Sequence, residues 1–144
     1  MMNEESVMYL VLVPPVACPR PRVTKKGFVY YPAGYTQFKK ALAHELEQLD
    51  IPPFEGGIPL ILRARFFMPK PKRGQYIGYH YKKPDLDNLV KSLCDGLEAA
   101  GVIPNDSQFA QLDCVKCYSP NPKIMFMIEE ANWEELHENQ EGSE

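Results

Sequence analysis

The sequence has no hydrophobic run long enough to cross a membrane, which takes about 20 residues. Its first apolar run, residues 8–17, follows Glu4 and Glu5 and contains Pro14 and Pro15, so it has neither the charge pattern of a secretory signal nor the length of a membrane span. Internal repeats are also absent. We therefore expect a cytoplasmic protein without a membrane partner, and 144 residues suffice for one domain with its own core.

The chain is also poor in the patterns that build zinc and redox sites. Its three histidines are scattered without ligand spacing, at His44, His80 and His137. Cys114 and Cys117 form one Cys-x-x-Cys, but no second such pair accompanies it. Both cysteines lie in an apolar, strand-like run, residues 109–118, where residues three apart point to opposite faces. A packing role is therefore our prediction, with zinc or redox chemistry as the alternative.

An overall positive charge is missing as well, because the formal net charge is −3. The charges are unevenly distributed: residues 20–91 hold 14 of the 16 lysines and arginines and six acidic residues, whereas the rest of the chain holds two basic and 13 acidic residues. A basic surface formed by the first part would attract phosphate groups. A solvated charged face is the alternative interpretation of this bias.

The most informative feature is the acidic motif Pro84-Asp85-Leu86-Asp87. Proline restricts its own φ and disfavours helix for the residue before it, so the motif should be extended. Residues i and i+2 of an extended chain project to the same side, and Asp85 and Asp87 can therefore face one cation. Proteins hold Mg²⁺ with one or two carboxylates, waters and substrate phosphate. A turn or a solvated helix cap is the alternative for an isolated Asp-x-Asp.

A helical pattern follows this motif, with apolar residues at three- and four-residue steps: Leu86, Leu89, Val90, Leu93, Leu97 and Ala100. We expect Asp87 or Asn88 to cap its start and Gly101 to end it. Lys91 then lies one turn after Asp87 on the same side, and Asp95 continues that line. Asn88 and Asp95 are accordingly candidates for supporting the metal ligands.

Two further residues belong to this region. The loop of residues 101–107 turns the chain back towards the helix start, which makes Asp106 the natural third acid of the site. Gly96 lies in mid-helix, where glycine costs about 1 kcal/mol relative to alanine. We interpret Gly96 as a sign of close approach by another backbone, with a partner subunit as the candidate.

A basic and aromatic segment, residues 69–83, directly precedes the acidic motif. Its cations can neutralise phosphate charge, and its tyrosines can stack on exposed bases, each stacked base contributing about 1–3 kcal/mol. A solvated loop is the alternative, but long loops beside sites are commonly functional. Together with the earlier basic connector, residues 18–27, it supplies the candidate DNA contacts Arg20, Arg22, Lys25, Lys26, Lys70, Lys72, Arg73, Tyr76, Tyr79, Lys82 and Lys83.

The overall pattern predicts an α+β fold, with one small domain, a mixed sheet of about four or five strands and two main helices. Strands are expected at residues 8–13, 28–31, 59–68, 109–118 and 123–128, and a first helix at residues 35–49. The turn-rich residues 119–122 predict a hairpin between the last two strands. Arg63 and Arg65 alternate with apolar residues and face either DNA or solvent.

At this point the residues match a known family. The run Lys83–Leu97, KPDLDNLVKSLCDGL in one-letter code, with the later Asn105-Asp106, resembles the signature of the RusA-type Holliday junction resolvases. The resemblance is strongest over residues 83–108 and extends more loosely to Pro19–Arg22. Asn105 departs from it, because family members often have a second acidic residue there.

The resemblance implies a homodimeric endonuclease, of a kind common in phages and prophages, that cuts four-way and related branched DNA by paired nicks in opposed strands. It makes Asp85, Asp87 and Asp106 the catalytic carboxylates and metal ligands, and Lys91 the essential lysine. The cofactor that it implies is Mg²⁺, at one or two ions per site, with Mn²⁺ able to substitute. We expect the nuclease domain to cover residues 1–130, followed by an acidic tail, residues 131–144, too polar at its end to pack.

Two other functions stay open. A nuclease acting on another DNA structure would share the carboxylates and differ in substrate geometry. A non-catalytic DNA-binding accessory protein would use the basic segments alone, with the acids as helix caps. The sequence indicates no protein partner beyond a second copy of the chain.

Overall fold

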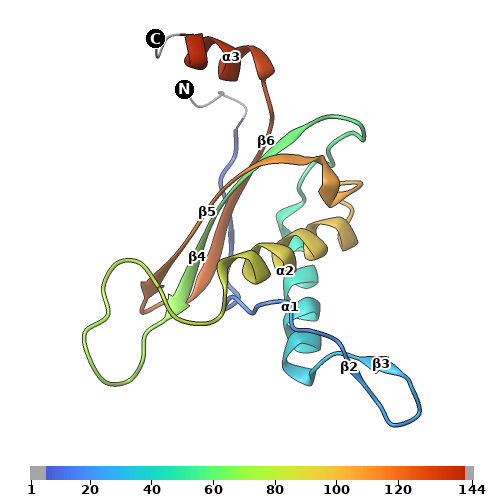
Figure 1. Ribbon diagram of the computed structural model, residues 1–144, viewed down its shortest axis with the longest axis vertical. Helices are drawn as coiled ribbons and strands as arrows, with labels where there is room; N and C mark the ends of the chain where they lie inside the picture. Colours follow the sequence, from blue (N-terminus) through green and yellow to red (C-terminus); the bar gives the residue numbers. More distant parts are fainter. Residues whose placement is uncertain (1–5, 142–144) are drawn as a thin grey trace.

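The structure is a computed structural model that describes residues 6–141. Its elements, in chain order, are β1 (Tyr9–Val11), β2 (Arg22–Val23), β3 (Val29–Tyr30), α1 (Ala33–Leu49), β4 (Leu60–Pro69), α2 (Leu86–Ala99), the 3-10 helix η1 (Asp106–Gln108), β5 (Phe109–Ser119), β6 (Lys123–Glu130) and α3 (Trp133–Glu141). They form an α+β domain with the two main helices that the sequence predicts (Figure 1). The sequence did not predict β2 and α3.

The main sheet has the strand order β1-β6-β4-β5. β4 pairs with β5 in parallel and with β6 in antiparallel orientation, and β1 pairs antiparallel with β6. A parallel pair needs a long crossover connection, which here contains the loop of residues 70–85 and α2. The crossover therefore attaches the predicted acidic motif to one face of the sheet.

The predicted hairpin between the last two strands is wrong. β5 and β6 lie on opposite sides of β4, so the link Pro120–Pro122 crosses the end of β4. Two interstrand spacings of about 4.8 Å each separate the two strands, a span that three linking residues cover in extended form. The turn-like composition of this link does not reveal which strand lies between its neighbours.

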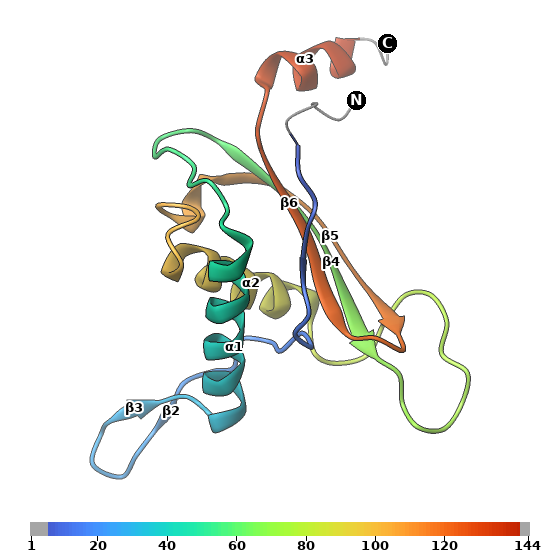
Figure 2. The same cartoon turned by 180° about the vertical axis from the view of Figure 1, so that it is seen from behind.

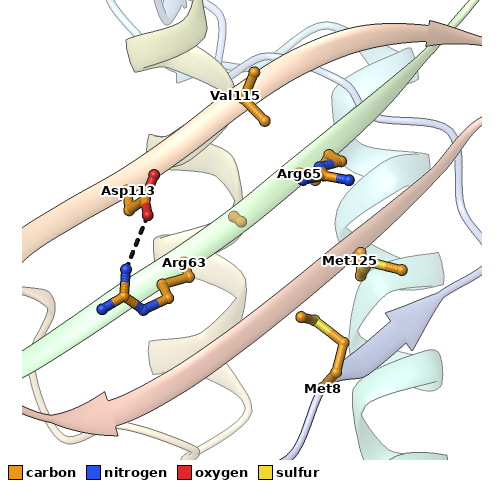
Figure 3. A pocket seen from close by; sticks show the side chains of 7 residues that line it. Met8, Arg63, Arg65, Asp113, Val115 and Met125 are labelled. Atoms are coloured by element: carbon orange, nitrogen blue, oxygen red, sulfur yellow. Dashed lines mark hydrogen bonds and ion pairs between the residues drawn. The ribbon is translucent and has the colours of Figure 1, made fainter. Parts of the chain in front are cut away.

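β4 has one face in the core and one open face. Leu62, Ala64 and Phe66 are buried in the cluster that α1 and α2 cover, while Arg63 and Arg65 alternate with them on the other face. These two arginines thus point away from α2, into a shallow hollow on the open face (Figure 3). There the Arg63 guanidinium donates from Nη1 to Asp113 and from Nε to Glu129, both at 2.8 Å.

Gly96 marks a close approach within one chain rather than between subunits. A Cβ at this position would meet the Leu42 side chain of α1, whose Cγ would lie at 3.2 Å. Such a contact is tighter than packed side chains normally make, so Leu42 packs against Gly96 in the space that a larger side chain would fill. The expectation of a partner backbone at Gly96 is therefore wrong.

The ribbon of β2 and β3 and the helix α3 lie at opposite ends of the longest axis (Figures 1 and 2). β2 and β3 form a two-stranded sheet of their own, which the sequence predicted only in part as a strand at residues 28–31. The start of α3 is capped by Asn132, whose Oδ1 accepts from the Glu134 N–H at 2.9 Å. Residues 142–144 of the predicted acidic tail lie outside the described residues. None of the described helices has the length and hydropathy of a membrane span.

Candidate functional site

The acidic motif forms the entrance of α2. Asp85 is the N-cap residue in extended conformation, with φ −69° and ψ 143°, and the helix begins at Leu86. The sequence predicted the cap one or two residues too late, at Asp87 or Asn88, because extended backbone ends at Asp85. Asp87 lies in the first turn, where its Oδ1 accepts from the Asn88 N–H at 3.0 Å. Both aspartates are exposed, and the positive end of the helix dipole stabilises their charge.

Asp87, Lys91 and Asp95 occupy successive turns of α2 and form an acidic stripe with a lysine inside it. The Lys91 ammonium lies 3.5 Å from the nearer Asp95 carboxylate oxygen. The negative charge of Asp95 raises the pKa of Lys91, and Asp106 adds to this effect. Lys91 is therefore held as a cation and is suited to stabilising negative charge rather than to accepting a proton.

η1 brings Asp106 to the side of α2, but beside Asp95 rather than at the helix start, where the sequence predicted it. Its turn is closed by Asn105, whose Oδ1 accepts from the Ser107 N–H at 2.9 Å. The carboxylate oxygens of Asp106, Asp95 and Glu98 all lie within 4.8 Å of one another, and all three side chains are half-buried.

The described residues therefore place Asp106 beside the second half of α2, and the three-membered cluster does not include Asp85 or Asp87. The helical rise of 1.5 Å per residue puts Asp95 about 12 Å along the axis from Asp87. Sequence reasoning named Asp95 as a supporting residue and missed Glu98. The spacing of Glu98 could have identified it, because Glu98 follows Asp95 by three residues and so lies on the same side of the helix.

Lys116 of β5 clamps the segment that leads into the acidic motif. Its Nζ donates to the carbonyl oxygens of Lys82 at 2.5 Å and Pro84 at 2.7 Å. The register of β5 against β4 puts Lys116 beside Phe66, on the face that the helices cover. Sequence reasoning missed this residue. The available signal was that Lys116 is the one cation in β5.

The Pro69–Lys83 loop is attached to the edge of the sheet at β5. The Tyr118 N–H donates to the Gly78 carbonyl at 2.9 Å, and the His80 N–H donates to the Lys116 carbonyl at 3.0 Å. The structure also separates the tyrosines of the loop. Tyr76 is half-buried against Tyr118, with ring centroids 5.1 Å apart, whereas Tyr79 is 76% exposed and open to a base.

The basic connector passes the first turn of α2. The Cys18 N–H donates to the Asn88 carbonyl at 3.0 Å, which ties the connector to the helix. The cationic side chains that the sequence proposed as DNA contacts are all exposed: Arg20, Arg22, Lys25, Lys26, Lys70, Lys72, Arg73, Lys82 and Lys83. The connector thus contacts the first turn of α2 at Cys18, and the loop leads directly into Asp85.

The cysteines of the Cys-x-x-Cys lie on different faces of β5. Cys114 packs against the core, and Cys117 pairs with Phe67 on the open face. Burial raises the pKa of the Cys114 thiol to about 11 and also raises that of Cys117. Zinc ligands and redox-active cysteines are thiolates that share one site, so this arrangement favours a packing role.

Two comparisons show which known proteins the chain is similar to. A stretch of 78 residues is 31% identical to the "Crossover junction endodeoxyribonuclease rusA" of Lactococcus phage r1t, and covers 54% of this chain and 60% of that relative. The chain thus matches less than two thirds of the relative's length. Residues 13–129 match the family described as endodeoxyribonuclease RusA. Because that match covers most of the chain, the chain belongs to the RusA endodeoxyribonuclease family.

Proposed function

We propose that this protein is a Mg²⁺-dependent endonuclease that resolves four-way DNA junctions and related branched DNA by paired symmetric nicks. The observation that supports this most directly is the acidic stripe on α2, in which Lys91 lies between the exposed Asp87 and the half-buried Asp95, at the end of the basic loop. Family membership gives the same reaction class, since the family is one of endodeoxyribonucleases. The phage relative is named for crossover junctions, the substrate that we propose here.

The carboxylates of α2 and η1 fit a hard divalent cation, because they offer charged oxygen donors with room for water and phosphate. We propose Asp85, Asp87 and Asp106 as the ligands of one or two Mg²⁺ ions, with Mn²⁺ as a substitute. Bound Mg²⁺ would supply an activated water and positive charge at the phosphate. The close approach of Asp106 to Asp95 and Glu98 provides a competing ligand set, which mutagenesis can separate from the first.

Lys91 acts in the proposed mechanism as a fixed positive charge. The neighbouring Asp95 keeps its ammonium protonated and holds it on the stripe. A cation at this place stabilises the additional negative charge of the phosphorane in the transition state. Lys116 has a positioning role, because its bonds to two carbonyls fix the backbone from which Asp85 projects.

Paired nicking requires two copies of the site, and we propose that a homodimer supplies them. A four-way junction has two equivalent strands to cut, so a two-fold dimer matches the symmetry of the substrate. The exposed cations of the loop and the connector would contact the phosphates of the arms.

The test is incubation of the purified protein with a synthetic four-way junction, a linear duplex and single-stranded DNA, each with Mg²⁺, Mn²⁺ or EDTA. We expect symmetric nicks in opposed strands of the junction with either metal ion and none with EDTA. Equal cutting of the duplex would instead indicate a nuclease of different specificity. Tight junction binding without cutting under any metal condition would indicate an accessory protein.

A further inference from the structure

The β2–β3 ribbon, residues 20–31, carries apolar and aromatic side chains that the fold does not bury. Every residue from Arg20 to Tyr31 is exposed, and Phe28 has 70% of its surface open to solvent. The ribbon is a separate sheet and projects from the domain at the end opposite α3 (Figures 1 and 2). A contiguous group of exposed apolar side chains indicates a binding surface.

The tip of this ribbon has a defined conformation. The Thr24 N–H donates to the Phe28 carbonyl at 2.8 Å, and the Phe28 N–H donates to the Thr24 hydroxyl at 3.0 Å. The Gly27 N–H closes the turn by donating to the Thr24 carbonyl at 2.9 Å, with Gly27 at φ +88°, a conformation that favours glycine. Phe28 is therefore held at a fixed place in the ribbon.

The two faces of the ribbon differ in chemistry. Arg22 pairs with Tyr30, and Val23 pairs with Val29. Because side chains alternate along a strand, Phe28 shares the face of Arg22 and Tyr30, and the two valines share the other. The first face thus combines a guanidinium with two aromatic rings, groups that contact phosphates and stack on bases.

The charge of this surface favours nucleic acid as its occupant. The chain has no acidic residue between positions 6 and 44. Within residues 6–141, no carboxylate forms an ion pair with the ribbon's cations, Arg20, Arg22, Lys25 and Lys26. Apolar side chains flanked by cations are the combination with which proteins unstack base steps while holding the adjacent phosphates.

We propose that Phe28 is a wedge that inserts between bases at the branch point of the DNA, with Arg22, Lys25 and Lys26 on the flanking phosphates. This inference rests on the proposed function, and it adds a second DNA site separate from the acidic stripe. Unstacking costs least where base pairing is already interrupted. The branch point is such a place, so the wedge would favour a junction over a continuous duplex.

The experiment uses four-way junctions that carry 2-aminopurine at the branch point, in EDTA so that no strand is cut. It compares the wild type, Phe28→Ala and the matched control Val23→Ala, which changes a similarly exposed apolar residue on the opposite face. We expect the wild type and Val23→Ala to raise the fluorescence of the base analogue by unstacking it. Phe28→Ala should abolish this rise and weaken junction binding about tenfold, with duplex binding unchanged.

Each other outcome contradicts a defined part of the proposal. If Phe28→Ala binds and unstacks junctions like the wild type, the wedge is wrong and the proposed function stands. If Phe28→Ala changes the oligomeric state in light scattering and leaves the fluorescence rise intact, the ribbon contacts a second copy of the chain instead of DNA. If the wild type itself binds no junction, the proposed function fails and the wedge fails with it.

Discussion

The two cationic segments of this protein, the Pro69–Lys83 loop and the β2–β3 ribbon, differ in how they are attached to the domain. The loop is bonded to the edge strand β5 through Gly78 and His80, and Lys116 holds its end. The ribbon is tied near its base, where the Cys18 N–H meets α2, and the bonds of its outer part lie within its own turn.

Because of this difference, the loop positions the proposed catalytic acids, whereas the ribbon extends away from them. The loop leads directly into Asp85, so its attachment determines where the acids stand, and misplacement of about 1 Å at a catalytic site can cost 100-fold in rate. The ribbon projects away from the acids and can contribute mainly to affinity. We therefore expect changes at the end of the loop to reduce cleavage and changes in the ribbon to reduce binding.

The largest effect is expected at the acids to which the loop leads. Asp87→Asn should abolish junction cleavage, because it removes a ligand charge at nearly constant volume, and Asp85→Asn and Asp106→Asn should do the same. Junction binding should survive or tighten, since a carboxylate without metal repels phosphate. Cleavage and gel-shift assays measure the two quantities.

The matched control for Asp87→Asn is Glu98→Gln, in the carboxylate cluster with Asp95 and Asp106. It should cleave at close to the wild-type rate. An inactive Glu98→Gln together with an active Asp87→Asn would move the metal site to Asp95, Glu98 and Asp106.

The next largest effect concerns Lys91. Lys91→Ala should lower the cleavage rate about 10²- to 10³-fold, as expected for loss of a group that stabilises the transition state, with a much smaller loss of affinity. Lys91→Arg should also be poor, because a planar fork does not replace a compact ammonium. Single-turnover rates and dissociation constants separate the two effects. Equal losses of rate and affinity would make Lys91 a phosphate anchor.

A third change would release the end of the loop from the domain, as the outer part of the ribbon is already free of it. Lys116→Met removes the two bonds to the Lys82 and Pro84 carbonyls and should lower cleavage up to about 100-fold at unchanged junction affinity. Amide exchange of residues 78–89 should accelerate, and Lys116→Arg should restore part of the rate. Unchanged exchange and cleavage in a folded Lys116→Met protein would refute the positioning role.

The charges of both segments should affect binding in proportion to their number. Replacing Lys70, Lys72 and Arg73 by alanine should lower the slope of log affinity against log salt by roughly 2.7, and replacing Lys25 and Lys26 by roughly 1.8, at about 0.9 per duplex phosphate contact. Titrations from low to high salt measure these slopes. A segment whose variant keeps the wild-type slope does not contact phosphate.

The smallest effect is expected at the end of the molecule that carries α3. A truncation after Asn132 keeps all of β6 and the Arg63–Glu129 ion pair, and should cut junctions at the wild-type rate. A truncation after Ile128 is a poorer test, because it also removes Glu129 and shortens β6. Loss of cleavage by the folded Asn132 truncation would give α3 a role in the reaction.

Local patterns predicted α2 well and its entrance less well. The apolar repeat and the stop at Gly101 are properties of one segment, and Gly101 does end the helix at φ +76°. The cap was misplaced because Asp85, Asp87 and Asn88 are all good N-cap residues. Only the backbone conformation distinguishes among them.

The sequence by itself determined the helix that carries Asp87, Lys91 and Asp95 on one side, since a 3.6-residue repeat needs no knowledge of the rest of the chain. Tertiary structure alone decided the partners of that helix. In the folded chain, β4 lies between β5 and β6, Leu42 packs against Gly96, and Lys116 donates to the carbonyl of Pro84. These contacts join residues far apart in the chain, and they depend on strand order and register, which local composition does not specify.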